Sequence, residues 1–327
     1  MILTTTKQKV LFELLAHQGE WLSGDELATD LQISRESIWK AINALKKKHH
    51  QIESRKNLGY QYIETPMLDK DVVHYYLDNR LVDDVFVEQE VTSTQHLAKQ
   101  YLTSHYIQKP VIFAAESQSN GYGRRGRAFY SPATSGLYFT IILPNTTDDW
   151  SQVGLLTTSM AVVIAQTLEQ FFPDEQIDLK WVNDLFINDK KVGGIITEAN
   201  IELESKSASA FIMGVGLNLT TDNFPEELLN IAQGINSQVK VDRNQLLVTL
   251  ANRIINTYEH GDIPTLLAEY RHRSNVIGKR VTLKLGNKMI TGTAKQIAND
   301  GGLIIEDENG ITKSFTSGEV IKTTVFR

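Results

Sequence analysis

A glycine- and arginine-rich stretch, residues 116–132, is the part of this sequence best suited to chemistry. It reads Glu-Ser-Gln-Ser-Asn-Gly-Tyr-Gly-Arg-Arg-Gly-Arg-Ala-Phe-Tyr-Ser-Pro. Glycines let a backbone approach a ligand closely, and arginines supply fixed positive charge and forked donors. The stretch therefore predicts a loop that closes over a ligand carrying phosphate or carboxylate. The alternative is a solvated surface loop.

Four further polar segments accompany this loop along the chain. They are Thr-Ser-Thr-Gln at 92–95, Lys-Trp-Val-Asn-Asp at 180–184, Lys-Lys-Val-Gly-Gly-Ile-Ile-Thr-Glu at 190–198 and Gly-Val-Gly-Leu-Asn at 214–218. Charged side chains at the ends of central strands are costly to bury unless they are paired or face a ligand. Lys180, Asp184 and Lys191 are therefore predicted to be functional. A structural salt bridge between Lys191 and an acid is the alternative.

Apolar periodicity predicts the elements that position these segments. Residues 111–115 and 136–144 are expected strands on either side of the loop, and the strand 85–91 leads into Thr92–Gln95 and a helix over 96–106. A long core helix is predicted at 152–172. Further strands are expected at 178–182, 185–188, 191–198 and 208–215, with closing helices at 242–260 and 264–272.

The first 65 residues have the pattern of a helix-turn-helix followed by a hairpin. A helix over 4–17 ends before Gly19, Ser23 caps a second helix, and Ser34 caps a third. The hairpin spans 51–64 around Gly59. Side chains that could contact DNA lie on the third helix and hairpin: Ser34, Arg35, Glu36, Ser37, Lys40, Asn43, Lys47, Arg55 and Lys56. A domain used only for packing is the alternative.

Charge separates this segment from the rest of the chain. Residues 1–63 hold nine Lys and Arg against seven Asp and Glu, a balance of +2, whereas the whole chain has a net charge of -6. DNA affinity follows the number of phosphates neutralised, so a single such domain would bind weakly. Dimerisation at two half-sites is therefore expected.

Composition indicates an ordinary globular chain of two or three domains. The 327 residues are 41% hydrophobic and 22% charged, and they include no cysteine, which excludes disulfides, a thiolate nucleophile and Cys-type zinc sites. No apolar run approaches the roughly 20 residues needed to cross a bilayer, and the start lacks a signal-peptide pattern. A cytoplasmic protein without a membrane partner is predicted.

Residues 276–327 alternate short strands with turn dipeptides such as Gly286-Asn287 and Gly301-Gly302. This alternation predicts a small β module. No catalytic constellation is apparent in it.

The loop and its four companion segments, in order and spacing, resemble the biotin protein ligases over roughly residues 85–327. The amino-terminal pattern is similar to the winged helix of bifunctional ligase/repressors in that family. The resemblance implies an α+β chain with a winged helix-turn-helix at 1–65, a mixed α/β catalytic domain of the biotin/lipoate-ligase type at 66–275 and an SH3-like barrel at 276–327.

The resemblance also implies a role for each matching residue. Lys191, Arg124 and Asp184 are implied to be catalytic. Biotin binding is implied for Ser93, Thr94, Gln118, Gly121, Tyr122, Arg124, Lys191 and Gly194, and binding of ATP or the adenylate for Arg125, Arg127, Phe129, Lys180, Asn183 and Asn218. Residues 223–237 resemble a second loop that covers the adenylate. Three positions depart from the usual family pattern: Gln95 replaces asparagine, Tyr122 replaces arginine, and Phe129 stands near the position where many relatives carry a stacking tryptophan.

The implied activity is the ATP-dependent formation of biotinyl-5'-AMP and transfer of biotin to a lysine of a biotin carboxyl carrier domain of acetyl-CoA or pyruvate carboxylase. Mg²⁺ would accompany the ATP phosphates, through ligands that the sequence does not identify. The implied partners are operator DNA and a second copy of the chain, with the adenylate as corepressor. Two alternatives remain, a lipoate-type ligase and a ligand-responsive transcription factor without ligase turnover.

Overall fold

A computed structural model describes residues 5–78, 80–145, 153–202 and 207–324 of the chain. The chain divides into two compact units, one of residues 1–79 and 241–248 and the other of residues 80–240 and 249–327. Thr4 and Gln152, the first residues of the helices predicted at 4–17 and 152–172, lie outside the described residues.

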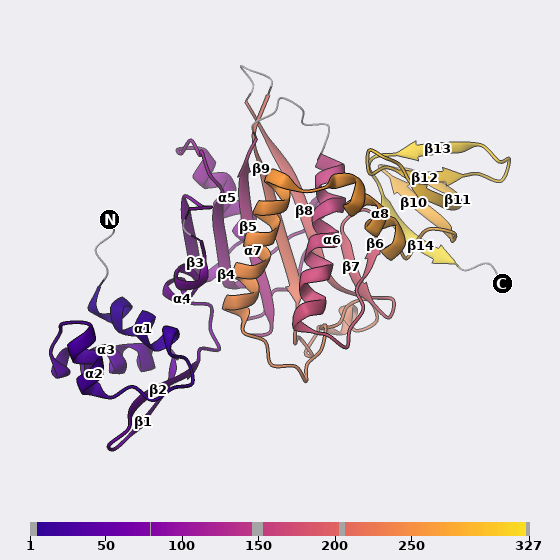
Figure 1. Cartoon of the computed structure of the whole chain (residues 1–327). Coiled ribbons are helices and arrows are strands. Elements are labelled where there is room, and N and C mark those ends of the chain that lie inside the picture. The colour runs from indigo at the N-terminus through magenta and orange to yellow at the C-terminus, as the bar shows by residue number, and fades with distance from the viewer. Residues whose placement is uncertain (1–4, 79, 146–152, 203–206, 325–327) are drawn as a thin grey trace. The chain divides into compact units, whose positions relative to one another are not determined.

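The first unit is a winged helix-turn-helix, as the sequence predicts (Figure 1). Its elements are α1 (Thr6–Ala16), α2 (Gly24–Asp30), α3 (Arg35–Lys47), β1 (Gln51–Arg55), β2 (Gly59–Glu64) and α4 (Lys70–Tyr76). Thr5 and Ser23 form capping boxes, and the Ser34 hydroxyl accepts from the N–H of Ser37, so local side chains start all three helices.

One apolar core holds this winged helix together. Leu11 and Leu14 of α1, Ile42 of α3 and Tyr62 of β2 are among its buried members. Gly59 begins β2 at a φ of 101°, and a Cβ there would lie 2.0 Å from the Leu22 carbonyl oxygen. The hairpin therefore closes onto residue 22 only because position 59 has no side chain.

A seven-stranded mixed sheet is the centre of the second unit, in the order β3-β4-β5-β9-β8-β7-β6 (Figure 1). Only β3 and β4 pair in parallel among these neighbours. The strands are β3 (Asp84–Val91), β4 (Val111–Gln118), β5 (Gly136–Pro144), β6 (Asp178–Lys180), β7 (Asp184–Ile187), β8 (Lys190–Glu202) and β9 (Ser207–Asn218). Strands β4 and β5 flank the glycine-rich loop, as predicted.

Helices pack on this sheet and supply much of the buried core. They are α5 (Thr94–Leu102), α6 (Val153–Phe171), α7 (Arg243–His260) and α8 (Ile263–Arg273). The α5 helix packs on β4, β5 and β9, whereas α6 packs on β6, β7, β8 and α8. Among the described residues, no helix combines the length and the apolar character needed to span a bilayer.

The predicted boundaries of a helix and a strand near the glycine-rich loop were wrong. The helix expected at 96–106 begins at Thr94, so its first turn follows Ser93 directly, and it ends at Leu102, where the Thr103 hydroxyl donates to the Gln100 carbonyl. The strand expected at 178–182 ends at Lys180, because residues 181–183 turn the chain into β7. The turn leaves Lys180 directly opposite Asp184.

The carboxyl-terminal strands form a five-stranded antiparallel sheet in the order β13-β12-β11-β10-β14. They are β10 (Arg280–Leu285), β11 (Lys288–Ile297), β12 (Leu303–Glu306), β13 (Thr312–Phe315) and β14 (Glu319–Thr324). Strand β14 was not predicted from the sequence. This strand matters because its first residues reach the pocket described next.

Candidate functional site

A pocket opens on the central sheet and encloses about 980 Å³ of empty space, part of it open to solvent. Its floor is one face of β8 and β9, where Gly194 pairs with Gly216 and Ile196 pairs with Gly214. Successive strand residues alternate between faces, so these four positions share the pocket side. Three of the four are glycines, which leaves room for a ligand to lie on the sheet.

One end of the pocket is polar and uncharged. The Thr94 N–H donates to Gln118 Oε1 over 2.9 Å, and the Gln118 amide donates to the Ser131 hydroxyl over 3.0 Å. The Thr140 hydroxyl lies within donating distance of both Thr94 Oγ1 (2.9 Å) and Gln95 Oε1 (3.2 Å). These bonds fix donors and acceptors in advance, as recognition of a small polar ring requires.

Ser93 belongs to the same end. It is the residue before α5, yet its side chain makes no capping hydrogen bond, although it is 3% exposed. Capping is the ordinary role of serine at such a position. The hydroxyl does not cap the helix, and Ser93 lines the pocket.

The glycine-rich loop folds back on itself over this floor. Tyr122 and Ala128 form an isolated bridge, and the Phe129 N–H donates to the Gly121 carbonyl over 2.8 Å. A Cβ at Gly121 would lie 2.7 Å from the Ser131 hydroxyl, so the loop base closes only around glycine. The loop thus carries Tyr122 at its start and Arg124, Arg125 and Arg127 along its length, all of which line the pocket.

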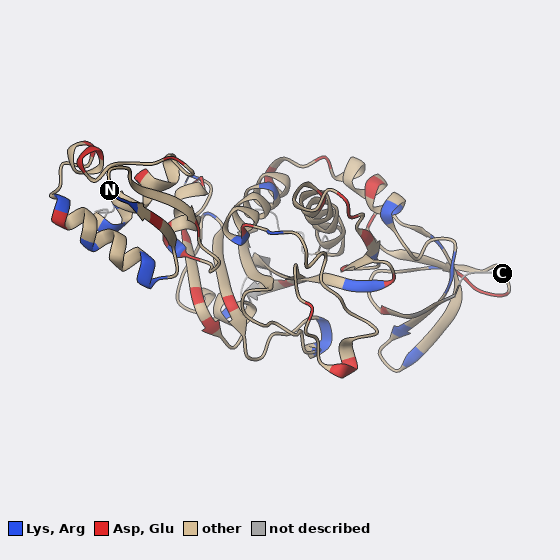
Figure 2. Ribbon diagram, turned by 90° about the horizontal axis from the view of Figure 1, so that it is seen from below, with Lys and Arg blue, Asp and Glu red and all other residues tan. Residues whose placement is uncertain are grey.

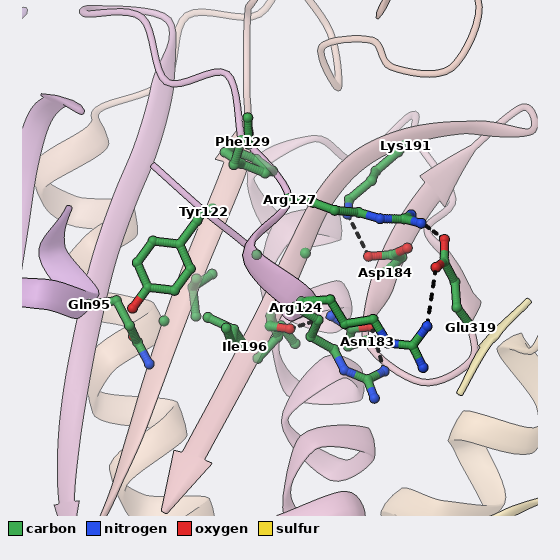
Figure 3. Close-up of a pocket in the computed structure, with 18 of the residues that line it drawn as sticks. Gln95, Tyr122, Arg124, Arg127, Phe129, Asn183, Asp184, Lys191, Ile196 and Glu319 are labelled. Atoms are coloured by element: carbon green, nitrogen blue, oxygen red, sulfur yellow. Dashed lines mark hydrogen bonds and ion pairs between the residues drawn. The ribbon is translucent and has the colours of Figure 1, made fainter. Parts of the chain in front are cut away.

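Cations gather at the other end of the pocket (Figure 3). Figure 3 shows Lys191, Asp184 and Glu319 on one side and Tyr122 with Gln95 on the opposite side. Among the lining residues, Arg124, Arg125, Arg127, Lys180 and Lys191 face two carboxylates, Asp184 and Glu319. This end therefore has a surplus of three positive charges, which favours an anionic ligand.

Lys191 is paired with Asp184. Its Nζ lies 2.6 Å from Asp184 Oδ1, and the two side chains remain 32% and 27% exposed. A Cβ at Gly194 would lie 3.0 Å from that Nζ, so the ammonium rests on the glycine backbone. The salt bridge expected as the structural alternative is present, and it orients the lysine within the pocket.

Arg124 and Lys180 lie near the same pair. Burial, followed by the charge of Arg125, lowers the pKa of the Arg124 guanidinium, whose contacts to Asn183 Oδ1 and the Gly318 carbonyl are both 3.4 Å long. Burial also lowers the pKa of the Lys180 ammonium, although Asp184 opposes that effect. Within the described part of the chain, neither cation is in an ion pair, and half-buried cations of this kind favour a negatively charged ligand.

The carboxyl-terminal strand β14 adds a pocket residue, Glu319, that was not predicted from the sequence. Glu319 bonds to Arg127, and one of its oxygens lies 3.9 Å from Arg125. Arg125 also donates to the Lys284 carbonyl. These contacts connect the arginines of the glycine-rich loop to the carboxyl-terminal sheet. No local sequence pattern indicated this role of Glu319, because its contact with Arg127 joins residues 192 positions apart.

The residues assigned to the nucleotide are partly brought together. Phe129 lines the pocket, and a Cβ at Gly216 would lie 2.8 Å from its ring. The Asn183 amide donates to the Ile195 carbonyl over 2.5 Å. Asn218 does not line the pocket, but it is 3% exposed, and among the described residues its amide oxygen has no hydrogen-bond partner.

Residues 223–237, predicted to be a second loop that covers the adenylate, lie beside the strand that carries Lys191. The Lys191 N–H donates to the Ile231 carbonyl over 2.9 Å, and the Gln233 N–H donates to the Lys191 carbonyl over 3.0 Å. No residue of 223–237 lines the pocket in the part of the chain that the structure describes.

In the first unit, the residues predicted to contact DNA lie on or beside α3 and on the hairpin. Ser34, Arg35, Glu36, Lys40, Lys47, Arg55 and Lys56 are exposed, and Ser37 and Asn43 are partly buried. Figure 2 shows basic and acidic residues interspersed over the winged helix. Three of the predicted basic residues are paired with acids: Arg35 with Asp25, Lys40 with Glu36 and Arg55 with Glu53. Trp39 on α3 is 58% exposed and was not among the residues predicted to contact DNA.

Comparison with known proteins agrees with this geometry. Residues 87–218 match the Biotin/lipoate A/B protein ligase family, residues 6–61 an HTH domain, and residues 276–323 the Biotin protein ligase C terminal domain. The fold and site therefore define a protein ligase of the biotin/lipoate class with an amino-terminal helix-turn-helix domain. Among the ligases of this class, the chain belongs to the family of bifunctional ligase/repressors.

Relatives of that kind match along nearly the whole chain. The bifunctional ligase/repressor BirA of Salmonella typhimurium is 30% identical over 328 residues, covering 97% of each chain. The BirA of Bacillus subtilis is 28% identical over 324 residues, covering 96% of this chain and 98% of the relative. The Aquifex aeolicus biotin protein ligase in complex with biotin and ATP superposes with a TM-score of 0.60 at 26% identity, covering 72% of this chain and 97% of that structure. The predicted family and fold class are confirmed.

Proposed function

We propose that this protein is an ATP-dependent biotin protein ligase that also represses transcription of biotin genes. The observation that carries the proposal is the two-ended pocket. The pocket has an uncharged polar end and a strongly cationic end. The two ends are separated along strand β8, in which each residue advances about 3.3 Å. Such a pocket suits an acid with a polar ring at one end and a carboxylate at the other, where it meets a nucleotide phosphate.

In the first step, a carboxylate oxygen of biotin attacks the α-phosphorus of ATP. The bond from that phosphorus to the bridging oxygen breaks, and its electron pair leaves with pyrophosphate. Because two anions must approach one another, the cations at this end lower the barrier. Lys191, oriented by Asp184, is assigned to the carboxylate and α-phosphate, and Arg124 to the same reacting groups.

In the second step, a neutral lysine amine of the acceptor attacks the acyl carbon of biotinyl-5'-AMP. The acyl–oxygen bond breaks, AMP leaves with the electron pair, and the amine loses a proton as the amide forms. None of the pocket residues is required as a nucleophile, so this chain contributes orientation and exclusion of water. The loop at 121–128 and the segment 223–237 are assigned to that covering role.

The uncharged end is assigned to the ring of biotin, through Ser93, Thr94, Gln118, Gly121 and Tyr122, with Gly194 beside the reacting end. A cyclic urea carries both N–H donors and a carbonyl acceptor, which match this set. A dithiolane ring carries neither, so the same groups would remain unpaired against lipoate. Arg125, Arg127, Phe129, Lys180, Asn183 and Asn218 are assigned to the nucleotide.

Mg²⁺ is proposed to accompany ATP, where it would offset phosphate charge. Among the described residues, no cluster of three or more His, Asp or Glu side chains could hold a metal ion. Asp184 and Glu319 are the carboxylates among the pocket-lining residues. We therefore propose that the phosphates supply most of the ligands of the ion.

The repressor function is assigned to residues 1–65, followed by the catalytic domain at 66–275 and the carboxyl-terminal domain at 276–327. The exposed polar side chains of α3 and the hairpin support operator binding. With a charge balance of only +2 over residues 1–63, two copies would bind an operator far better than one. We propose a cytoplasmic protein that dimerises with bound adenylate and transfers biotin to a carboxylase carrier domain.

The test is to incubate the purified protein with ATP, Mg²⁺ and either biotin or lipoate, and to follow pyrophosphate release and retained acyl-adenylate. Biotin-dependent release with a retained adenylate is expected. Turnover with lipoate alone would move the protein to the lipoate class. Absence of turnover with both acids would leave a ligand-responsive DNA-binding protein, and operator binding with and without biotin would then be measured.

A further inference from the structure

An ion pair behind the uncharged end of the pocket connects two residues that line it. Lys99 of α5 lies 2.8 Å from Glu198 of β8, and neither side chain is among the pocket-lining residues. Glu198 accepts from the Gln95 amide over 2.7 Å, and Lys99 donates to the Tyr122 hydroxyl over 3.2 Å. One ion pair therefore holds both Gln95, in the first turn of α5, and Tyr122, in the glycine-rich loop.

The bond to Glu198 fixes which way the Gln95 amide points. Gln95 Nε2 donates both to the Glu198 carboxylate and to the Ile212 carbonyl, which are acceptors only. The oxygen must therefore be the atom that lies over Gly214, where a Cβ would be 2.5 Å from it. Gly214 is part of the pocket floor, and Gln95 is 2% exposed. The chain thus presents a fixed hydrogen-bond acceptor at this end.

The bond to Lys99 fixes the Tyr122 hydroxyl in the opposite sense. An ammonium group can only donate, so the phenol oxygen accepts from it and keeps its own proton available. Among the residues that the structure describes, no acceptor is hydrogen-bonded to that hydroxyl. Burial lowers the pKa of Lys99, but the contacts with Glu198 and Tyr122 outweigh burial and raise it, so the ammonium stays charged. Tyr122 is thereby a donor beside the Gln95 acceptor.

We propose that the Lys99–Glu198 ion pair is a positioning pair that makes this end of the pocket selective for a ring bearing both an N–H donor and a carbonyl acceptor. Gln95 accepts from the ring N–H, and Tyr122 donates to its carbonyl. Glu198 lies four residues beyond Gly194 on the same face of β8, about 13 Å along the strand, so the pair acts far from the phosphate end. The inference rests on the proposed function, because it concerns the acid that the ligase activates.

The test compares the full-length wild-type protein with Lys99→Met, which keeps the aliphatic stem and removes the charge. We expect the KM for biotin to rise about tenfold, the equivalent of roughly one lost hydrogen bond, while the KM for ATP and kcat stay unchanged. Lys99→Arg should restore most of the affinity. The matched control is Lys295→Met, which breaks a pair with Glu306 of similar exposure (47% and 34%, against 40% and 33%) in the carboxyl-terminal sheet.

Tyr122→Phe completes a double-mutant cycle. If Lys99 acts through the hydroxyl, the double variant should lose no more biotin affinity than the stronger single variant. Independent, additive losses would overturn the positioning role, as would an unchanged KM for biotin in Lys99→Met. Parallel increases in both KM values would indicate general disruption and also overturn it. A wild-type protein that activates no biotin would instead refute the proposed function itself.

Discussion

Replacement of Lys191 by methionine tests the cationic end of the pocket most directly. At about 4 Å and an effective dielectric near 20, two unit charges interact by about 4 kcal/mol. Because the Lys191 side chain is 32% exposed, solvent screening leaves about half of that. The change also leaves Asp184 unpaired beside two reacting anions, which adds about 1 kcal/mol of repulsion. The sum, about 3 kcal/mol, predicts a loss of roughly a hundredfold in the rate of adenylate formation.

The assay is biotin-dependent pyrophosphate release under saturating ATP, with Lys190→Met as the matched control. The Lys190 ammonium donates to the Leu229 carbonyl and does not line the pocket, so that variant should retain the wild-type rate. Combining Lys191→Met with Asp184→Asn should recover part of the loss, because the unpaired carboxylate is removed. A wild-type rate in Lys191→Met, or an equal loss in the Lys190 variant, would refute the electrostatic argument.

Three further predictions concern other parts of the chain. Glu319→Gln removes the charge that holds Arg127 and Arg125, so the retained acyl-adenylate should escape several-fold faster in a gel-filtration chase; unchanged retention would contradict this role of β14. Gly216→Ala places a Cβ 2.8 Å from the Phe129 ring, and the KM for ATP should rise about tenfold while that for biotin changes less; equal effects would contradict nucleotide stacking. Gly59→Ala should destabilise the winged helix by about 3 kcal/mol in denaturant unfolding and abolish operator binding while pyrophosphate release persists; normal operator binding would show that the hairpin tolerates a side chain there.

Much of the fold could be predicted from local signals. Thr5, Ser23 and Ser34 cap the helices that they precede, and the predicted strands around the arginine loop are β4 and β5. The errors fall where tertiary contacts outweigh local preference. The α5 helix begins two residues early, so that Thr94 and Gln95 bond to other elements, and β14 was missed because its pairing partner β10 lies far back in the sequence.

The sequence by itself determined which residue types are present and in what order: an arginine loop between two strands, lysines and an aspartate at strand ends, and a capped helix-turn-helix. These are local properties, set by backbone preference, charge and the spacing of apolar side chains. Only the tertiary structure decided which of them meet. It paired Lys191 with Asp184, brought Glu319 to the arginine loop, and joined Gln95 to Tyr122 through Lys99 and Glu198. Such contacts connect residues up to 194 positions apart, and their geometry follows from sheet register and packing, which no local pattern specifies.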